Sequence, residues 1–65
     1  MKLSIPDMSC GHCKAVVEKT ISAEDPSAKV AIDLTERVAE VETSADPARL
    51  IEALRAEGYE AEVAG

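Results

Sequence analysis

Residues 30–41 read VAIDLTERVAEV, and this stretch decides the fold because apolar and polar residues alternate in two runs around Thr35-Glu36. Alternation with a period of two is typical of strands that bury one face. The polar pair between the runs is a plausible tight turn, so the stretch is predicted to form a hairpin. The apolar positions on its buried face are Val30, Ile32, Leu34, Ala39 and Val41.

Helical patterns flank this hairpin on both sides. From about Cys13 to Ile21 apolar residues recur at helical spacing, and Asp25-Pro26 ends the pattern because proline cannot continue a helix. Asp46-Pro47 predicts the start of a second helix, since aspartate caps free N–H groups and proline fits the first helical position. Gly58 suits the end of that helix. The buried stripe of this second helix is predicted to consist of Leu50, Ile51 and Leu54.

Two shorter alternating runs lie near the ends of the chain. Leu3 and Ile5 predict a first strand, which Pro6 ends. The resulting order predicts an α+β, ferredoxin-like βαββαβ fold, with both helices on one face of a four-stranded antiparallel sheet. No linker is apparent, so residues 1–65 are expected to form a single domain. The last strand is predicted to contain Tyr59, Ala61 and Val63.

The composition excludes several classes of function. A chain of 65 residues buries only about 60% of the surface that it exposes when unfolded, which leaves no room for an enclosed substrate cavity. The net charge is −6, the 13 acidic and 7 basic residues are scattered, and there is one Tyr but no Phe or Trp. Nucleic-acid binding needs a basic stripe and usually stacking rings, and a membrane-surface helix needs a cationic face. The sequence shows neither pattern.

The start of the chain bears on where the protein works. Residues 1–6 contain one lysine but not the apolar segment of a signal peptide, and no apolar run is long enough to span a bilayer. A cytoplasmic location without membrane insertion is therefore expected. Thiols are kept reduced in that compartment, so two cysteines do not by themselves predict a disulfide.

Cys10 and Cys13 are the residues with the clearest chemistry. Their C-x-x-C spacing places one in a predicted loop and the other at a predicted helix start, so both sulfurs can point at the same spot. The unpaired N–H groups and partial positive charge of a helix start favour thiolate over thiol, and Lys14 is expected to add to this effect. Thiolate is the form of cysteine that binds metal.

The number of nearby ligands indicates which metal is bound. A structural Zn(II) site normally has four ligands, but His12 is the one obvious third ligand here and no fourth is apparent nearby. Two thiolates with few hard donors suit Cu(I), which prefers sulfur and tolerates a low coordination number. We therefore expect a non-enzymatic Cu(I) site, with Zn(II) as a second ion in vitro. A thiol–disulfide redox site also uses C-x-x-C, although usually with Trp or Pro beside the pair.

Three residues near the cysteines each have two interpretations. Met8 is expected to be buried beneath the loop rather than to act as a thioether ligand. His12 is expected to face solvent and tune affinity rather than to bind metal in the monomer. Tyr59 is either an ordinary core residue or one that places its hydroxyl near a sulfur, and both interpretations stand at this point.

The chain resembles the heavy-metal-associated domain family, and specifically its bacterial cytosolic copper chaperones. The resemblance covers nearly the whole chain, and it implies an open-faced β-sandwich of βαββαβ order. It is carried by Met8–Cys13 directly after a strand, Val30–Leu34, Leu50–Leu54 and Gly58-Tyr59.

The resemblance also implies roles for individual residues. Cys10 and Cys13 match the family's two metal ligands, and Met8 matches its buried loop-supporting methionine. Tyr59 matches the position where bacterial chaperones carry tyrosine beside the site. Zinc-type members tend to carry aspartate directly before the first cysteine, whereas Ser9 stands here, and this difference favours copper.

The partners follow from the same resemblance. Such chaperones pass Cu(I), by exchange of thiolates, to the metal-binding domain of a copper-transporting P-type ATPase or to a copper-responsive repressor. The acidic balance is expected to suit a partner with a basic docking face. Because the site is exposed, either a monomer or a metal-bridged homodimer is expected.

Three alternatives remain open. The chain is either free-standing or an N-terminal domain of a transporting ATPase, and the closeness of Met1 to the first predicted strand and of Gly65 to the last favours a complete small protein. A thiol–disulfide enzyme is a second alternative. A mercury carrier is a third, but that role usually goes with a periplasmic signal.

Overall fold

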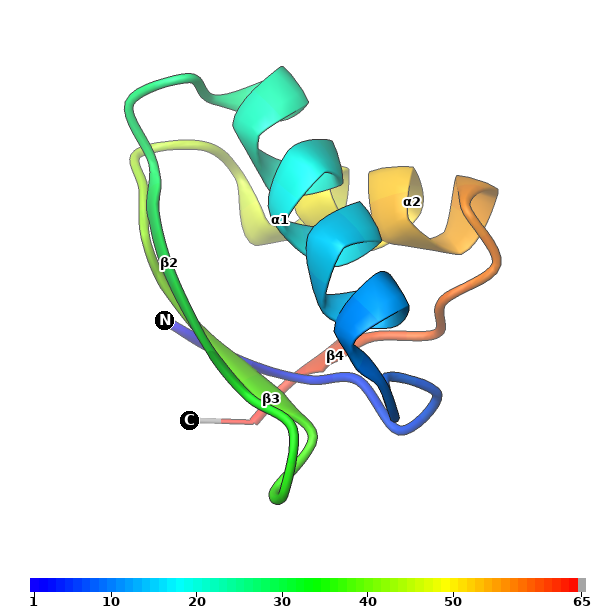
Figure 1. Cartoon of the computed structure of the whole chain (residues 1–65). Helices are drawn as coiled ribbons and strands as arrows, with labels where there is room; N and C mark the ends of the chain where they lie inside the picture. The colour runs from blue at the N-terminus through cyan, green and yellow to red at the C-terminus, as the bar shows by residue number, and fades with distance from the viewer. Residues whose placement is uncertain (65) are drawn as a thin grey trace.

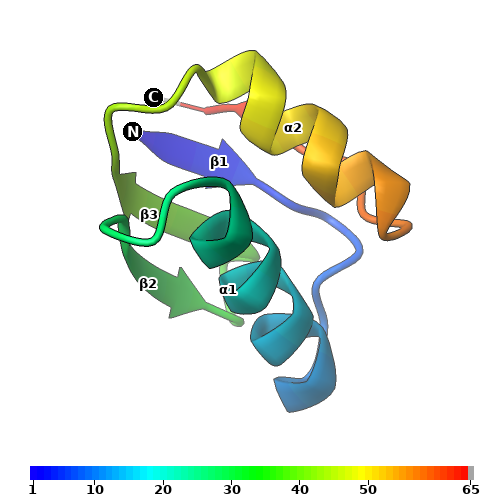
Figure 2. The same cartoon turned by 90° about the horizontal axis from the view of Figure 1, so that it is seen from above.

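The protein is a two-layer structure of six elements. The computed structural model describes residues 1–64. The elements are β1 (Lys2–Ser4), α1 (Gly11–Glu24), β2 (Lys29–Asp33), β3 (Val38–Glu42), α2 (Pro47–Ala56) and β4 (Glu62–Val63). Both helices cover the same face of the sheet (Figure 1), and the view from above shows them next to each other over the strands (Figure 2). The predicted ferredoxin-like βαββαβ order is therefore confirmed.

The sheet holds the end of β1 from both sides. Its strand order is β2-β3-β1-β4, and all neighbouring pairs are antiparallel. The predicted hairpin forms the pair β2–β3, in which Val30 is opposite Val41. Leu3 of β1 is opposite Ala39 on one side and Val63 on the other. The chain therefore leaves a fixed central strand when it enters the loop that leads to α1.

The core lies between the sheet and the two helices. Alternate strand residues point to the helix side, and the helices turn their apolar stripes toward the sheet. Burying apolar surface stabilises the fold by about 25 cal/mol per Å². Leu50 and Leu54 are buried as predicted, whereas Ile51 is half-buried. The fully buried residues are Leu3, Ile5, Met8, Val17, Ile21, Ala39, Leu50 and Leu54, with Val41 almost so.

The last strand is shorter than the sequence predicts. β4 contains only Glu62 and Val63. Tyr59 and Ala61 pack partly against the core, but 53% of Val63 is exposed. Residues 57–61 connect the helix layer to the sheet edge, so only the residues beyond them pair with β1. The alternating pattern was therefore right about the inward face of Tyr59 and Ala61 and wrong about the length of the strand.

Helix α1 begins earlier than the sequence predicts. It starts at Gly11, so His12 lies in the first helical turn rather than in a loop. The carbonyl of Cys10 accepts a hydrogen bond from the Lys14 N–H at 3.0 Å and closes this turn. The apolar periodicity becomes regular only at Val16, and for that reason the pattern alone placed the start too late. Within residues 1–64, no helix has both the length and the apolar character needed to cross a bilayer.

Candidate metal centre

The loop between β1 and α1 is fixed from below by Met8. The Met8 N–H donates to the carbonyl of Ile5 at 3.0 Å, which makes a tight turn directly after β1. The Met8 side chain is fully buried and belongs to the core. A thioether in that position packs against apolar side chains. The loop that carries Ser9 and Cys10 is therefore held close to the core while both of these residues remain exposed.

Cys10 occupies the N-cap position of α1. Its backbone is extended, with φ −150° and ψ 172°, as expected of an N-cap residue, but its side chain makes no capping hydrogen bond. The first turn of a helix has N–H groups without intrahelical partners and carries partial positive charge. This end of α1 is therefore suited to stabilise a negative charge on a nearby sulfur.

The two cysteines converge at this helix start. The Sγ atoms of Cys10 and Cys13 are 3.4 Å apart, and both residues are free thiols. Cys10 is exposed, whereas Cys13 is half-buried and packs against the core. The structure thus brings together the two predicted ligands, with one on a surface loop and the other on a helix.

The surroundings of Cys13 favour its thiolate. The pKa of Cys13 is lowered from 9.0 to about 7, first by the Tyr59 hydroxyl and then by the backbone at Ser9 and the Cys10 side chain. Burial acts in the opposite direction but is the smaller effect. Each hydrogen bond to a thiolate stabilises the charged form relative to the neutral thiol. Near neutral pH a substantial share of Cys13 is consequently thiolate, which is the form of cysteine that binds metal.

Tyr59 reaches Cys13 because of the way in which α2 ends. Gly58 has φ 91°, a left-handed conformation that glycine adopts without strain. The Gly58 N–H donates to the Arg55 carbonyl at 2.9 Å, and the Tyr59 N–H donates to the Leu54 carbonyl at 2.9 Å. This pair of bonds is the Schellman motif, which turns the chain sharply after the helix.

The contact between the Tyr59 hydroxyl and Cys13 also affects Tyr59. Together with burial, this contact raises the pKa of Tyr59 to about 12, so the hydroxyl keeps its proton and acts as a donor.

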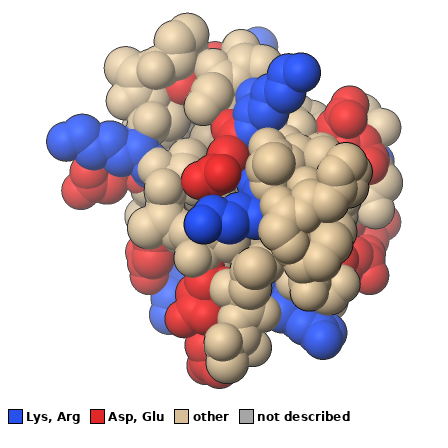
Figure 3. All heavy atoms as spheres, viewed as in Figure 1, with Lys and Arg blue, Asp and Glu red and all other residues tan. Residues whose placement is uncertain are grey.

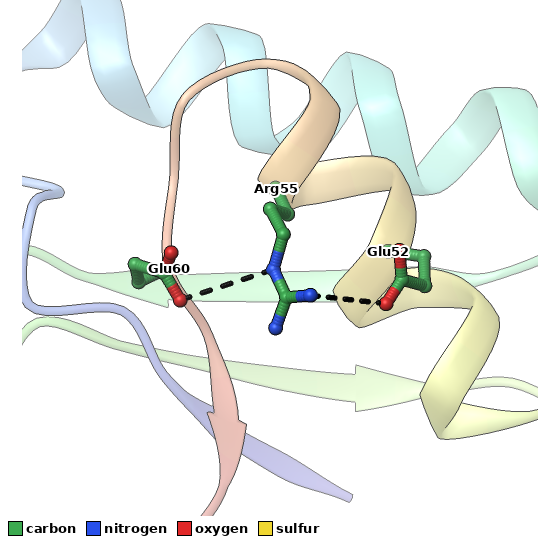
Figure 4. A network of polar contacts seen from close by, with 3 residues as sticks. All are labelled: Glu52, Arg55 and Glu60. Atoms are coloured by element: carbon green, nitrogen blue, oxygen red, sulfur yellow. Dashed lines mark hydrogen bonds and ion pairs between the residues drawn. The ribbon is translucent and has the colours of Figure 1, made fainter.

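An exposed ion-pair network lies next to Tyr59. Arg55 at the end of α2 contacts Glu52 at 3.2 Å and Glu60 at 4.0 Å (Figure 4). The contact with Glu60 joins the helix to the residue that follows Tyr59. Exposed ion pairs contribute about 0–1 kcal/mol each, so the backbone bonds at Gly58 are the main restraint on this turn.

His12 and Lys14 lie on the first turn of α1, and both are exposed. His12 therefore faces solvent, while a role in tuning affinity stays a prediction. Within residues 1–64, no group of three or more His, Cys, Asp or Glu side chains is arranged to hold a metal ion. The site offers two sulfurs at the surface, which is a donor set that fits a soft ion of low coordination number.

One contact to the loop was not found from the sequence. Arg37, in the turn between β2 and β3, donates from Nη1 to the carbonyl of Pro6 at 3.2 Å. No motif marks this residue, because the contact joins positions 31 residues apart in the chain.

The hollow between the two helices does not include the sulfur pair. An open hollow of about 580 Å³ lies between α1 and α2 and is lined by residues that include Thr20, Ala23 and Ala53. Neither cysteine contributes to it. The sulfur pair, with Cys10 exposed and Cys13 half-buried at the start of α1, therefore lies outside this hollow.

Comparison with known proteins agrees with this arrangement. The family model for the heavy-metal-associated domain matches residues 2–60. The chain belongs to the heavy-metal-associated domain family. A comparison of this chain with proteins of curated function found no match.

Solved structures of similar proteins include a copper chaperone and a gold binding protein. The copper chaperone Atx1 from Synechocystis PCC6803 shares 31% identity over 95% of this domain and 98% of its own chain, with a TM-score of 0.91. A gold binding protein shares 38% identity over 94% of each chain, with a TM-score of 0.90. Oxidized MerP from Ralstonia metallidurans CH34 shares 29% identity over 98% of this domain and 93% of its own chain, with a TM-score of 0.85.

Proposed function

We propose that this domain is a metallochaperone that binds one Cu(I) ion between the Sγ atoms of Cys10 and Cys13. The observation that supports this most directly is the convergence of two free sulfurs, 3.4 Å apart, at an uncapped helix start. Thiolates are the preferred ligands of Cu(I). The similarity to an Atx1 copper chaperone points to the same ion.

The small number of ligands supports Cu(I) over Zn(II). Zn(II) in structural sites is almost always held by four ligands in a tetrahedron. Cys10 and Cys13 supply two, and the part of the chain that the structure describes holds no cluster of three or more such ligands. Two thiolates satisfy Cu(I) but leave Zn(II) dependent on water or on a second molecule. We therefore expect Zn(II) to bind more weakly and to be displaced.

The exposure of the two sulfurs supports release of the ion by ligand exchange. A thiolate of the receiving protein forms a Cu–S bond and gives a three-coordinate ion, and the bond from copper to Cys10 then breaks. A second partner thiolate displaces Cys13 in the same way. Copper stays Cu(I) throughout, so the transfer needs no oxidant and the domain catalyses no reaction. Cys10 is expected to leave first because it is the exposed ligand on the loop, whereas Cys13 is half-buried on α1.

The receiving protein is proposed to be the metal-binding domain of a copper-transporting P-type ATPase or a copper-responsive repressor in the cytoplasm. The net charge of −6 favours a partner whose docking face is basic, since complementary charges speed the encounter. On the face in Figure 3, acidic and basic side chains are interspersed. The net charge of the domain is expected to affect how fast it meets the receiving protein, rather than which metal ion it binds.

A titration with a competing Cu(I) chelator tests the proposal. Wild-type protein is expected to take one Cu(I) per chain from the chelator, and Cys10→Ser with Cys13→Ser is expected to take none. Circular dichroism of both metal-free proteins controls for folding, which we expect to be unchanged because neither cysteine is fully buried. Tight Cu(I) binding by the double variant would overturn the proposed site.

The sulfur contact also favours a second function, thiol–disulfide exchange. The two sulfurs touch, and a Cys13 pKa of about 7 gives an attacking thiolate at neutral pH. Reduction of insulin disulfides by the dithiol form distinguishes the two functions. Turnover in that assay together with weak Cu(I) binding would favour the redox function.

A further inference from the structure

Arg37 has an unusual backbone conformation at the tip of the β2–β3 hairpin. Its φ is 58°, in the left-handed region that few residues other than glycine, asparagine and aspartate adopt. The turn is stabilised before it by Asp33, whose Oδ1 accepts a hydrogen bond from the Glu36 N–H at 3.1 Å. Arg37 then brings the chain back into β3, which begins at Val38.

Arg37 holds the two residues that directly follow β1. Its carbonyl accepts a hydrogen bond from the Ile5 N–H at 2.9 Å. Its Nη1 donates to the Pro6 carbonyl at 3.2 Å. Proline has no N–H, so this carbonyl is the one backbone group through which Pro6 can be held by a hydrogen bond.

These two contacts lie at the start of the metal loop, which is the segment of residues 5–10 between β1 and α1. Ile5 also accepts the Met8 N–H at 3.0 Å, and the Met8 side chain is buried. The loop is therefore restrained at Ile5 and Pro6 by Arg37 and at Met8 by the core, and Cys10 follows two residues later. Cys13 is restrained independently, because it lies within α1.

We propose that Arg37 is a positioning residue for Cys10, which holds the metal loop so that the Cys10 sulfur stays beside that of Cys13. The part of this proposal that concerns metal release rests on the proposed function as a Cu(I) carrier. A bond from copper to Cys10 breaks more often when the loop that carries the sulfur moves more freely. Loss of the guanidinium therefore speeds release of the ion without removing a ligand.

Two substitutions separate the side chain of Arg37 from its backbone. Arg37→Asn removes the guanidinium but keeps a residue that tolerates the left-handed conformation. Arg37→Lys keeps a long cationic donor that can reach the Pro6 carbonyl. Arg49→Gln is the matched control, because it removes one exposed positive charge from the start of α2.

The first measurement is the rate at which Cu(I) passes from each protein to an excess of chelator, with the thermal unfolding midpoint recorded in parallel. Groups that contact a metal ligand directly typically change affinity by a factor of about 10 to 100. Arg37 contacts Ile5 and Pro6 rather than Cys10 itself, so Arg37→Asn is expected to speed release by less, about threefold to tenfold. Arg37→Lys is expected to restore most of the wild-type rate, and Arg49→Gln to match wild type. The unfolding midpoint of Arg37→Asn is expected to stay close to that of wild type.

Either of two results overturns the proposal. One is a wild-type release rate in Arg37→Asn. The other is faster release in Arg37→Asn together with a lowered unfolding midpoint, where Arg37→Lys restores neither the release rate nor the midpoint. This result would mean that the substitution lowers the stability of the whole domain.

A second measurement needs no metal and so keeps this proposal separate from the proposed function. In the metal-free protein, hydrogen exchange at the Met8 amide is expected to be faster in Arg37→Asn than in wild type and Arg49→Gln. Unchanged exchange at Met8 overturns the positioning role even if wild type proves not to bind Cu(I). Failure of wild type to bind Cu(I), with faster Met8 exchange in the variant, contradicts the proposed function alone.

Discussion

The two helices of this domain begin in different ways. At the start of α2, the Asp46 side chain accepts a hydrogen bond from the Ala48 N–H at 2.9 Å, and Pro47 takes the first helical position. At the start of α1, Cys10 occupies the same capping position without a side-chain hydrogen bond. The N–H groups that stabilise the fold in α2 are therefore left available for thiolate charge in α1. In one small domain, the same structural position serves stability in one helix and chemistry in the other.

The largest expected effect comes from giving α1 the cap that α2 has. Cys10→Asp supplies a carboxylate at an extended N-cap position, so the free energy of unfolding of the metal-free protein is expected to rise by about 0.5–1 kcal/mol. Cu(I) affinity is expected to fall more than about 100-fold, because a hard oxygen replaces a soft sulfur. Urea unfolding and chelator competition measure the two quantities.

Cys10→Ala is the control for the substitution Cys10→Asp, because alanine provides neither a cap nor a ligand. It is expected to lose Cu(I) affinity to a similar extent without the gain in stability. Equal unfolding free energies for Cys10→Asp and Cys10→Ala would show that the start of α1 does not behave as an open capping site.

A smaller effect is expected when the cap of α2 is removed. Asp46→Ala leaves the Ala48 N–H without its partner and is expected to cost about 1 kcal/mol of unfolding free energy. Asp46→Asn retains an oxygen acceptor and serves as the control. Cu(I) affinity should be unchanged in both, since the start of α2 contributes no ligand. A changed affinity in Asp46→Ala alone would mean that the two helix starts are coupled.

The smallest change concerns the donor that Tyr59 supplies to Cys13. In a Cys10→Ala background, alkylation of Cys13 reports its thiolate alone, and adding Tyr59→Phe is expected to raise the midpoint of the rate against pH further toward 9.0 than Cys10→Ala alone does. Tyr59→Phe removes the largest of the effects that lower the pKa of Cys13, whereas the hydrogen bond from the backbone at Ser9 remains. An unchanged midpoint would show that the hydroxyl does not stabilise the thiolate.

The same shift has a consequence for stability. The folded pKa of Cys13 lies below the ordinary value, so the ionised form is favoured by folding. This contribution is fully present above pH 9.0 and is lost as the pH falls through about 7. The unfolding free energy of the metal-free protein should therefore rise between these two values, and Tyr59→Phe should weaken the rise.

Local signals in the sequence were enough to predict most of the fold. The cap at Asp46-Pro47 is made by neighbouring residues, and the hairpin follows from alternation around Thr35-Glu36, so both were visible in the sequence. The position of Cys10 and Cys13 around one helix start also follows from their spacing.

Contacts between distant parts of the chain were harder to predict. The approach of Tyr59 to Cys13 depends on how α2 lies over the sheet as well as on the turn at Gly58, so the local pattern left the role of Tyr59 open and the family resemblance alone placed it beside the site. The contact of Arg37 with Pro6 depends on the relative position of two strands, for the same reason. The length of β4 was overestimated because alternation continues through residues that connect two layers and do not pair.

Native mass spectrometry after equilibration with equal amounts of Cu(I) and Zn(II) shows which ion the proposed Cys10–Cys13 site prefers. Wild-type protein is expected to retain one Cu(I) per chain and no Zn(II), and the double variant Cys10→Ser with Cys13→Ser is expected to retain no metal. Preferential retention of Zn(II) by wild type, or Cu(I) on the double variant at the wild-type level, would contradict the proposed Cu(I) site.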